Sequence, residues 1–377
     1  MLLIIISTSL FVFYSALILY YRKAWKSIPH AEDSSVNGST TISVIIPARN
    51  EEVNIKTCLD SILRGDYPSH LYEVIVIDDH SDDATADIIK FYSGRNVHLI
   101  NLKEELKGLQ LNSYKKKAIE IAVQKALGRL IVTTDADCIL PEKWLSTIAS
   151  FYEKHNPAFI AAPVSYYREN SFLKIFQSLD FMTLQGITGA AVYNKFHNMC
   201  NGANLAYEKE AFYKVDGFKG IDALASGDDM LLMHKIYMQY PDRVMYLKSR
   251  DTIARTQPMN TWSKFFHQRI RWASKSDSYT DKKIIMVLML VYLFNACLLV
   301  MGLAAFFSLA IFHWLLAILV FKVIIELLFL YPVAEFFNKR KLLWYFALAQ
   351  PLHIIYILIA GWLGKFGSYN WKGRKVK

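Results

Sequence analysis

The chain has 377 residues, a net charge of +10 and a hydrophobic fraction of 53%. Its apolar residues are concentrated in residues 2–21 and 284–363, and the part between them has the composition of a globular domain. Much of the positive charge lies beside these apolar segments, where anionic lipid is a simpler partner than nucleic acid. Because the sequence has no basic-aromatic repeat and no zinc-finger spacing, we expect no nucleic-acid partner.

The first apolar segment, residues 2–21, carries no charge and has the length of about 20 residues that a membrane-spanning helix needs. A cleaved signal peptide is the alternative, but such a peptide starts with basic residues and ends in a small-residue cleavage site. Here the basic residues follow the apolar run, at Arg22, Lys23 and Lys26. Since positive charge stays on the cytoplasmic side, the pattern predicts an anchor over residues 1–22. A polar linker over residues 23–40 then leads into a cytoplasmic domain.

Strand-like and helix-like segments alternate across the predicted domain, residues 41–283. The strand-like segments have Ile and Val at successive positions, as strands buried on both faces do, and they cover residues 42–47, 74–78, 97–102, 130–135 and 159–164. The helix-like segments cover residues 52–63, 84–92, 114–127 and 142–154. This alternation predicts an α/β fold with a mostly parallel sheet flanked by helices.

Polar and acidic residues follow three of these strands directly, in the segments Ala48–Glu52, Asp78–Asp83 and Asp135–Cys138. Ligands of open α/β sheets bind outside the carboxyl ends of the strands. If the three strands are parallel, these segments meet at one edge of the sheet. We therefore expect a polar ligand site at that edge.

The Asp135-Ala136-Asp137 segment carries the clearest chemistry. Carboxylates at alternate positions of an extended turn provide ligands for Mg²⁺ or Mn²⁺, with a diphosphate completing the shell. Asp79 follows a second strand and can accept hydrogen bonds from a nucleobase or a ribose hydroxyl. Asp82 and Asp83 sit where a helix begins, so we assign them to helix capping.

Two further motifs lie nearer the membrane segments. Asp228 and Asp229 precede an amphipathic helix, and a carboxylate there can act as a general base on an acceptor hydroxyl; stabilisation of the helix N-terminus is the alternative. The second motif is Gln268-Arg269-Ile270-Arg271-Trp272. Arginine, present twice in it, can bind a pyrophosphate through paired hydrogen bonds. A basic-aromatic belt beside the membrane is the alternative interpretation of that motif.

The C-terminal apolar region, residues 284–363, predicts about three further membrane helices. Residues 284–332 are long enough for a hairpin that turns near residues 306–314, and residues 342–363 form another apolar segment. A full last span would leave the basic tail, residues 364–377, outside, which conflicts with the charge rule. The last segment is therefore either re-entrant or interfacial, or one hairpin is miscounted. Within the hairpin, Lys322 and Glu326 are four residues apart and are expected to form an ion pair.

In this order, the motifs resemble those of membrane-bound family 2 glycosyltransferases of the GT-A fold, which is Rossmann-like. The resemblance covers about residues 41–275. It rests on Pro47 with Asn50-Glu51, the Asp78-Asp79-His80-Ser81 turn, the Asp-x-Asp, the acidic pair and the Gln-x-x-Arg-Trp motif. It implies an inverting transfer from a nucleotide-sugar, most commonly a UDP-sugar, to a lipid or glycan acceptor at the membrane.

The resemblance also implies roles for individual residues. The nucleotide-sugar would be bound by Pro47, Glu51, Asp79, Lys115, Asp135, Gln268, Arg271 and Trp272. Asp135 and Asp137 would hold Mg²⁺ or Mn²⁺. Asp229 would be the general base, with Asp228 as the other candidate.

The sequence departs from the family pattern at His80, where glycine is usual, and we expect this residue to alter the turn. Asn201-Gly202-Ala203-Asn204 resembles an acceptor-side loop. The expected location is the cell inner membrane, with the catalytic domain in the cytoplasm. A processive polysaccharide synthase and a non-catalytic sugar-nucleotide-binding membrane protein are the competing hypotheses.

Overall fold

The computed structural model describes residues 1–31, 39–107, 111–222, 224, 227–274, 281–366, 369–371 and 374–376. The chain forms two compact units. The α/β unit comprises residues 29–167 and 198–257, and the helical unit comprises residues 1–28, 168–197 and 258–377. Residues 32–38 of the predicted linker lie outside the described residues.

The α/β unit is built on a seven-stranded sheet with the strand order β3-β2-β1-β4-β7-β5-β8. Its strands are β1 (Ile42–Ala48), β2 (Tyr72–Asp78), β3 (Val97–Asn101), β4 (Leu130–Thr133), β5 (Phe159–Ala161), β7 (Leu205–Glu208) and β8 (Val244–Tyr246). The first four are mutually parallel, β5 and β8 are parallel to each other, and β7 runs antiparallel to both β4 and β5. The predicted α/β fold with a mostly parallel sheet is confirmed.

Burial explains why these segments form strands. In β1, Val44, Ile45 and Ile46 are fully buried, so both faces of the strand are covered. The predicted strand over residues 159–164 is divided in the structure. Pro163 lies between β5 and β6 (Val164–Tyr166), and proline has no N–H to donate to a sheet. The chain therefore leaves the main sheet, and β6 pairs instead with β9 (Ala254–Thr256).

Seven α-helices accompany the sheet in the described part of the α/β unit: α2 (Ile55–Leu63), α3 (Thr85–Lys90), α4 (Leu102–Leu106), α5 (Tyr114–Lys125), α6 (Trp144–His155), α8 (Lys209–Lys214) and α9 (Met230–Gln239). Five of them correspond to predicted helices: α2, α3, α5, α6 and the helix after Asp229, α9. The predicted starts at residues 52 and 142 are too early, because turns precede both helices: Asn54 N donates to Glu51 O, and Trp144 N donates to Pro141 O.

The helical unit consists mainly of α1 (Leu2–Ser27), α7 (Phe172–Tyr193), α10 (Trp262–Ala273), α11 (Lys282–Ala304), α12 (Leu309–Phe336) and α13 (Phe346–Phe366). A 3-10 segment, Arg340–Tyr345, precedes α13, and β10 (Tyr369–Trp371) and β11 (Arg374–Val376) follow it. Within the part of the chain that the structure describes, four helices are long and apolar enough to cross a membrane: α1, α11, α12 and the segment from Arg340 to Lys365. This arrangement agrees with one N-terminal and three C-terminal membrane helices.

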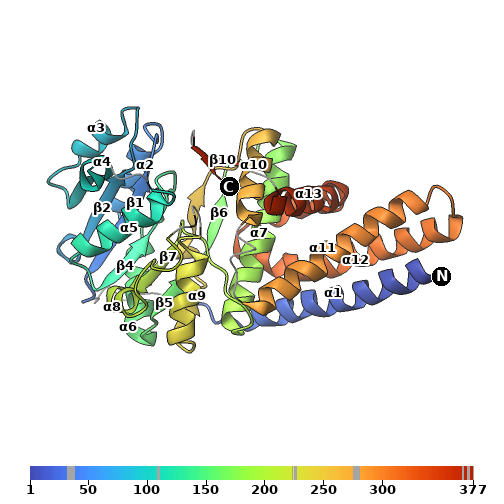
Figure 1. The fold of residues 1–377 in the computed structure, drawn as a ribbon. Helices are drawn as coiled ribbons and strands as arrows, with labels where there is room; N and C mark the ends of the chain where they lie inside the picture. The colour runs from blue at the N-terminus through green and yellow to red at the C-terminus, as the bar shows by residue number, and fades with distance from the viewer. Residues whose placement is uncertain are drawn as a thin grey trace. The chain divides into compact units, whose positions relative to one another are not determined.

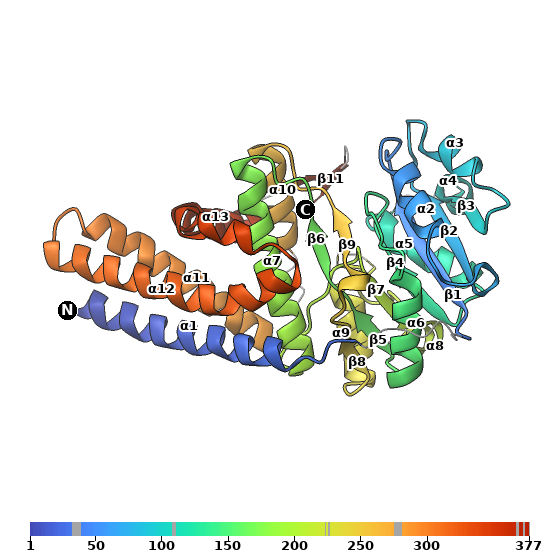
Figure 2. The same ribbon diagram turned by 180° about the vertical axis from the view of Figure 1, so that it is seen from behind.

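In both views α1, α11 and α12 run side by side, whereas α13 is foreshortened and points in a different direction (Figure 1, Figure 2). The predicted hairpin is present, with its turn between Ala304 and Leu309. The predicted ion pair is present as well, with Lys322 Nζ 2.7 Å from Glu326 Oε1. Gln350 of α13 donates to the other oxygen of Glu326 over 2.9 Å, and Tyr14 of α1 also hydrogen-bonds Glu326. The pair is therefore satisfied within the helical unit.

Candidate active site

Three segments with polar residues meet at one edge of the sheet, as predicted. Strands β2, β1 and β4 are adjacent and parallel, so their carboxyl ends point the same way. Residue pairing places Ala48 of β1 beside Asp78 of β2 and Ile45 beside Thr133 of β4. The segments that begin at Arg49, Asp79 and Thr134 therefore leave the sheet along a common edge.

The centre of the candidate site is a cluster of one lysine and three aspartates. The Lys115 ammonium, near the start of α5, lies 3.0 Å from Asp135 Oδ1 and 3.1 Å from Asp228 Oδ2. Asp229 is next to Asp228 in the chain and adds its charge to the same cluster. The structure thus joins the acids after β4 to the acids before α9, which are more than ninety residues apart in the sequence.

Electrostatics keep the lysine of this cluster charged. Burial lowers the pKa of Lys115, but the opposing charges of Asp135, Asp228 and Asp229 outweigh burial and leave the pKa well above its usual range. The ammonium therefore remains protonated at physiological pH. It neutralises part of the negative charge that the three carboxylates bring together.

Asp229 is held by the main chain on both sides. One of its oxygens accepts a hydrogen bond from Met230 N at 2.8 Å, and the other accepts from Gly202 N at 3.2 Å. The first of these bonds is a helix cap, so the alternative of helix N-terminal stabilisation is realised in part. The same two bonds fix the orientation of a carboxylate beside Lys115, which a positioned base also requires. The role of Asp229 as the base stays a prediction.

Gly202 lies beside the acidic cluster, where a Cβ atom would make ordinary van der Waals contacts. A Cβ atom at this position would lie 3.4 Å from Asp228 Oδ2, 3.5 Å from Lys115 Nζ and 3.7 Å from Asp229 Cβ. The Gly202 carbonyl also accepts a hydrogen bond from Thr133 Oγ1 of β4 at 3.1 Å. The Asn201–Asn204 loop, which resembles an acceptor-side loop, therefore lies directly beside the Lys115 and aspartate cluster.

Asn204, at the end of that loop, has a structural role instead. It is fully buried, and its side chain bonds Trp144 Nε1, Pro163 O and Thr252 O at 3.0, 2.7 and 2.6 Å. The sequence alone did not separate Asn204 from Gly202, because the two residues are neighbours in one motif. Only the side-chain partners distinguish their roles.

Asp135 and Asp137 provide carboxylate oxygens at the end of β4, which suit Mg²⁺ or Mn²⁺. Both residues are half-buried, and Asp137 Oδ2 accepts a hydrogen bond from Thr256 Oγ1 at 3.0 Å. Thr256 was not predicted, since a single threonine in β9 carries no sequence signal. Among the residues that the structure describes, no group of three or more His, Cys, Asp and Glu side chains is placed to hold a metal. The role of Asp135 and Asp137 as ligands of a cation, with a diphosphate and water completing its shell, stays a prediction.

The neighbouring edge, after β1 and β2, contains the residues predicted to bind the nucleoside. Asp79 is buried, its main-chain N–H donates to Ala48 O at 2.7 Å, and Arg49 Nη1 donates to its carbonyl at 2.9 Å. Glu51 Oε2 accepts from Asn54 Nδ2 at 2.8 Å, and Pro47 is half-buried at the end of β1. These three candidates lie at the expected edge, and their contact with a nucleoside stays a prediction.

His80 adopts the backbone that glycine would favour. Its φ angle is +56°, in the left-handed region, so the turn keeps the conformation that glycine usually provides there. Its Nδ1 lies 2.9 Å from Asp79 Oδ1. The expected change in the turn is therefore not seen in the backbone angle of His80, and its side chain adds a contact to Asp79.

Farther along, Asp83 accepts from Thr85 N, at the start of α3, at 3.0 Å and from Glu52 N at 3.1 Å. The N-cap of α3 is Ala84 and has no side-chain cap, so Asp83 stabilises the first turn without being the cap, and no capping bond of Asp82 is found among the described residues.

The remaining candidates lie on α10, in the helical unit. Gln268 Oε1 accepts from Arg269 Nη1 at 2.9 Å, and the Arg269 guanidinium lies over the Trp272 ring, 4.2 Å from its centroid. Arg271 is half-buried on the same helix. Their approach to the diphosphate stays a prediction.

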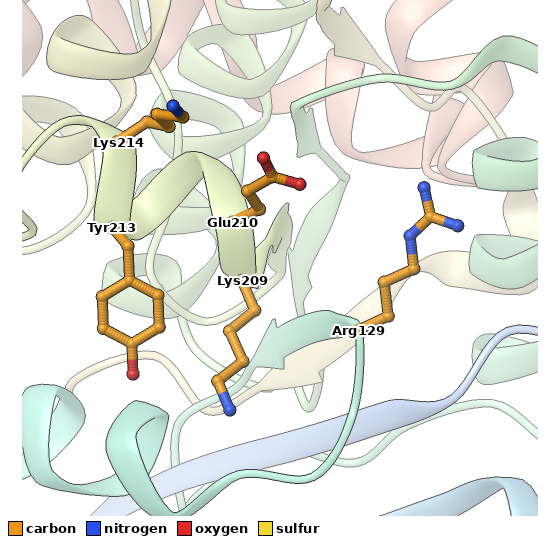
Figure 3. Close-up of a pocket in the computed structure, with 5 residues that line it drawn as sticks. All are labelled: Arg129, Lys209, Glu210, Tyr213 and Lys214. Atoms are coloured by element: carbon orange, nitrogen blue, oxygen red, sulfur yellow. The ribbon is translucent and has the colours of Figure 1, made fainter.

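A surface hollow of about 500 Å³ lies elsewhere on the α/β unit, lined by Arg129, Lys209, Glu210, Tyr213 and Lys214. Arg129 directly precedes β4, so the hollow is at the amino end of that strand. The five side chains do not converge on one point (Figure 3). The Lys209 ammonium donates to Ala126 O at 2.5 Å. The hollow is therefore separate from the acidic cluster at the carboxyl ends.

Comparison with known proteins identifies the family of the chain. The family model described as glycosyl transferase family 2 matches residues 43–216, and that of glycosyl transferase family group 2 matches residues 130–362. The second match covers more than half of the chain. The protein belongs to the family 2 glycosyltransferases.

Among similar proteins, glycosyltransferase AglE of Haloferax volcanii is 34% identical over 104 residues, which are 28% of this chain and 33% of AglE. The probable glycosyltransferase YdaM of Bacillus subtilis is 27% identical over 243 residues, 62% of this chain and 54% of YdaM. The matched segments thus span about a third and about half of these relatives.

A solved structure, the mannosyltransferase PcManGT from Pyrobaculum calidifontis in complex with GDP-Man and Mn²⁺, has a similar fold. It has a TM-score of 0.61 and 18% identity, and the likeness covers 96% of this chain and 98% of that one. The GT-A fold with associated apolar helices, expected from the motifs, is confirmed.

Proposed function

We propose that the protein is an inverting glycosyltransferase that moves a sugar from a nucleotide-sugar to a membrane-associated lipid or glycan acceptor. The observation that carries the proposal is the double ion pair of Lys115 with Asp135 and Asp228. It gathers a candidate diphosphate-binding acid and a candidate base at the carboxyl edge of the sheet. In an open α/β sheet, that edge is where ligands bind.

The proposed chemistry is a single displacement. The acceptor hydroxyl oxygen forms a bond to the anomeric carbon as the bond from that carbon to the diphosphate oxygen breaks. Asp229 takes the hydroxyl proton, and the nucleoside diphosphate leaves with the electron pair. The hydrogen bonds from Met230 N and Gly202 N hold this carboxylate in place. Asp228, which Lys115 orients, is the other candidate base.

Asp135 and Asp137 would hold Mg²⁺ or Mn²⁺ together with the diphosphate. Once bound, such a cation would offset the negative charge that develops on the leaving group. Thr256 fixes one oxygen of Asp137. Pro47, Glu51 and Asp79 would bind the nucleoside of the donor. The expected donor is a UDP-sugar. Gln268, Arg271 and Trp272 would close over the diphosphate and the acceptor.

The helical unit supports an acceptor held at a membrane. We propose that α1, α11 and α12 span the cell inner membrane and that the α/β unit lies in the cytoplasm, on the side of the basic residues Arg22, Lys23 and Lys26. The direction of α13, different from that of the other three, favours the interfacial alternative (Figure 1). An interfacial α13 leaves the basic tail on the cytoplasmic side, as the charge rule requires.

The test is a donor-panel assay on the membrane fraction, with UDP-, GDP- and TDP-sugars and Mn²⁺. Asp137→Ala and Asp229→Asn should each lower transfer by about 10²–10⁴-fold. Asp87→Asn is the matched control, because Asp87 is an exposed aspartate of α3 that pairs with Lys90. Full activity in both site variants would show that the proposed site is wrong.

The same assay separates the competing hypotheses. A single addition gives one product band from a labelled donor, whereas a processive synthase gives a ladder of long chains. A non-catalytic binding protein would retain labelled donor without hydrolysis or transfer. A ladder would contradict single addition and keep the site, while retention without turnover would contradict the enzyme itself.

A further inference from the structure

A buried arginine inside the Gln-x-x-Arg-Trp segment contacts two of the residues assigned to the substrate. Arg269 is 4% exposed and lies on α10 between Gln268 and Trp272. Its Nη1 donates to Gln268 Oε1 at 2.9 Å. Its guanidinium also covers the Trp272 ring at 4.2 Å from the centroid, a distance at which a cation is attracted to an indole face.

Arg269 is itself held from outside α10. Its Nε and Nη2 lie 3.0 and 2.7 Å from Asp180 Oδ2, and Asp180 is a buried residue of α7. The other oxygen of Asp180 accepts a hydrogen bond from the hydroxyl of Tyr356 on α13. Asp180 thus connects three helices of the helical unit through one carboxylate.

Aromatic rings complete the enclosure. Phe265 lies under the guanidinium at 4.8 Å, and Phe181 packs against Trp272 with ring centroids 5.9 Å apart. The guanidinium thus contacts two aromatic rings as well as Asp180 and Gln268, and each contact restrains its rotation. The planar shape and the several donors of arginine are both used here, so a lysine would not replace it.

We propose that Arg269, held by Asp180, is a positioning residue that fixes Gln268 and Trp272 for transfer. It does not touch the substrate. It sets the side-chain conformations of two residues that do, and Tyr356 sets the position of Asp180. This inference rests on the proposed function of Gln268 and Trp272, and it adds Asp180 and Tyr356 as residues on which the reaction depends.

The test compares full-length variants in detergent, measuring kcat, the donor KM and the unfolding temperature. Asp180→Asn and Arg269→Lys should each lower kcat by about 10–100-fold, because small misplacements of positioning groups have effects of that size. Tyr356→Phe removes one hydroxyl only, so it should fold and lower kcat by a smaller factor.

The matched control is Glu169→Gln. Glu169 bonds Lys339 and Ser178 of α7, so it also ties α7 to a neighbouring segment of the helical unit, but among the described residues it forms no hydrogen bond or ion pair with α10. This variant should lower the unfolding temperature while leaving kcat within about two-fold of wild type.

A second measurement separates positioning from folding. In a Gln268→Ala/Trp272→Ala background, Asp180→Asn should change kcat by less than about two-fold, since the residues that it positions are gone. A further loss equal to that in wild type would overturn the inference, as would unchanged kcat in Asp180→Asn and Tyr356→Phe. If Gln268→Ala and Trp272→Ala leave transfer unaffected, the proposed role of Gln268 and Trp272 in transfer is wrong. If these two variants lower transfer and Asp180→Asn does not, the proposed function stands and the positioning role of Arg269 and Asp180 is wrong.

Discussion

Lys115→Met would remove the cation at the centre of the acidic cluster. The ammonium lies about equally far from Asp135 and Asp228, at 3.0 and 3.1 Å, and both ion pairs are lost together. Three carboxylates would then repel one another in a partly buried site. Removing one partner of a buried ion pair costs about 3–5 kcal/mol. Asp135 is 39% exposed and solvent screens its share, so we expect a loss of about 2–4 kcal/mol in unfolding free energy without divalent cations.

Mn²⁺ should reverse much of this loss, because the variant site carries one more net negative charge near Asp135. If the cation binds Lys115→Met about tenfold more tightly than wild type, its binding free energy is more favourable by about 1.4 kcal/mol. The assay is unfolding of the purified protein across a Mn²⁺ titration, with Lys117→Met as control. Lys117 lies on the same helix in a half-exposed pair with Glu120, whose loss should cost under about 1 kcal/mol.

Two results would contradict this reasoning. Wild-type stability of Lys115→Met in the absence of divalent cations would mean that the lysine does not hold the acids together. Equal Mn²⁺ stabilisation of Lys115→Met and Lys117→Met would mean that the cation does not bind beside Asp135. Either result would also weaken the assignment of Asp135 to the diphosphate.

The remaining predictions concern stability. Asn204→Ala would leave Trp144 Nε1 and Thr252 O without their partner, while Pro163 O would keep its bond from Ala254 N. We therefore expect a loss of about 3 kcal/mol in the free energy of unfolding, measured by chemical unfolding. Unchanged stability with lost activity would instead indicate a functional role for Asn204. Burial lowers the pKa of Lys248 to about 8, below the value of about 10.4 in an unfolded chain. The unfolded state therefore binds more protons between these values, and wild-type stability rises with pH across that window. Lys248→Met should raise the unfolding temperature most at pH 7 and least near pH 10, and a difference independent of pH would refute this.

Local sequence patterns predicted the parts of the fold that depend on neighbouring residues. Continuous Ile and Val runs identified β1, β2 and β4, since strands covered on both faces need apolar side chains at every position. The same patterns placed Asp79 and Asp135 directly after strands. Parallel pairing then required these acids to share one edge, and the sheet has that pairing.

Some local predictions failed for identifiable reasons. The strand over residues 159–164 is interrupted at Pro163, which cannot donate a ladder hydrogen bond. Helix α7 was not predicted, because its apolar residues are mixed with buried polar ones such as Gln177, Asp180 and Gln185. That mixture gives no clear apolar face in the sequence. Partners distant in the chain satisfy two of these polar residues: Met259 bonds Gln177, and Arg269 and Tyr356 bond Asp180.

By itself the sequence determined the fold class, the apolar helices and the positions of the acids along the chain, because these follow from the spacing of residue types over a few turns or strands. Only the tertiary structure decided that Lys115 joins Asp135 to Asp228, that Asn204 is structural while Gly202 borders the cluster, and that Asp180 holds Arg269. Each of these contacts links residues from segments distant in the chain. Such a contact depends on the path of the loops that bring distant segments together. The pattern of residue types within a single helix or strand does not determine that path.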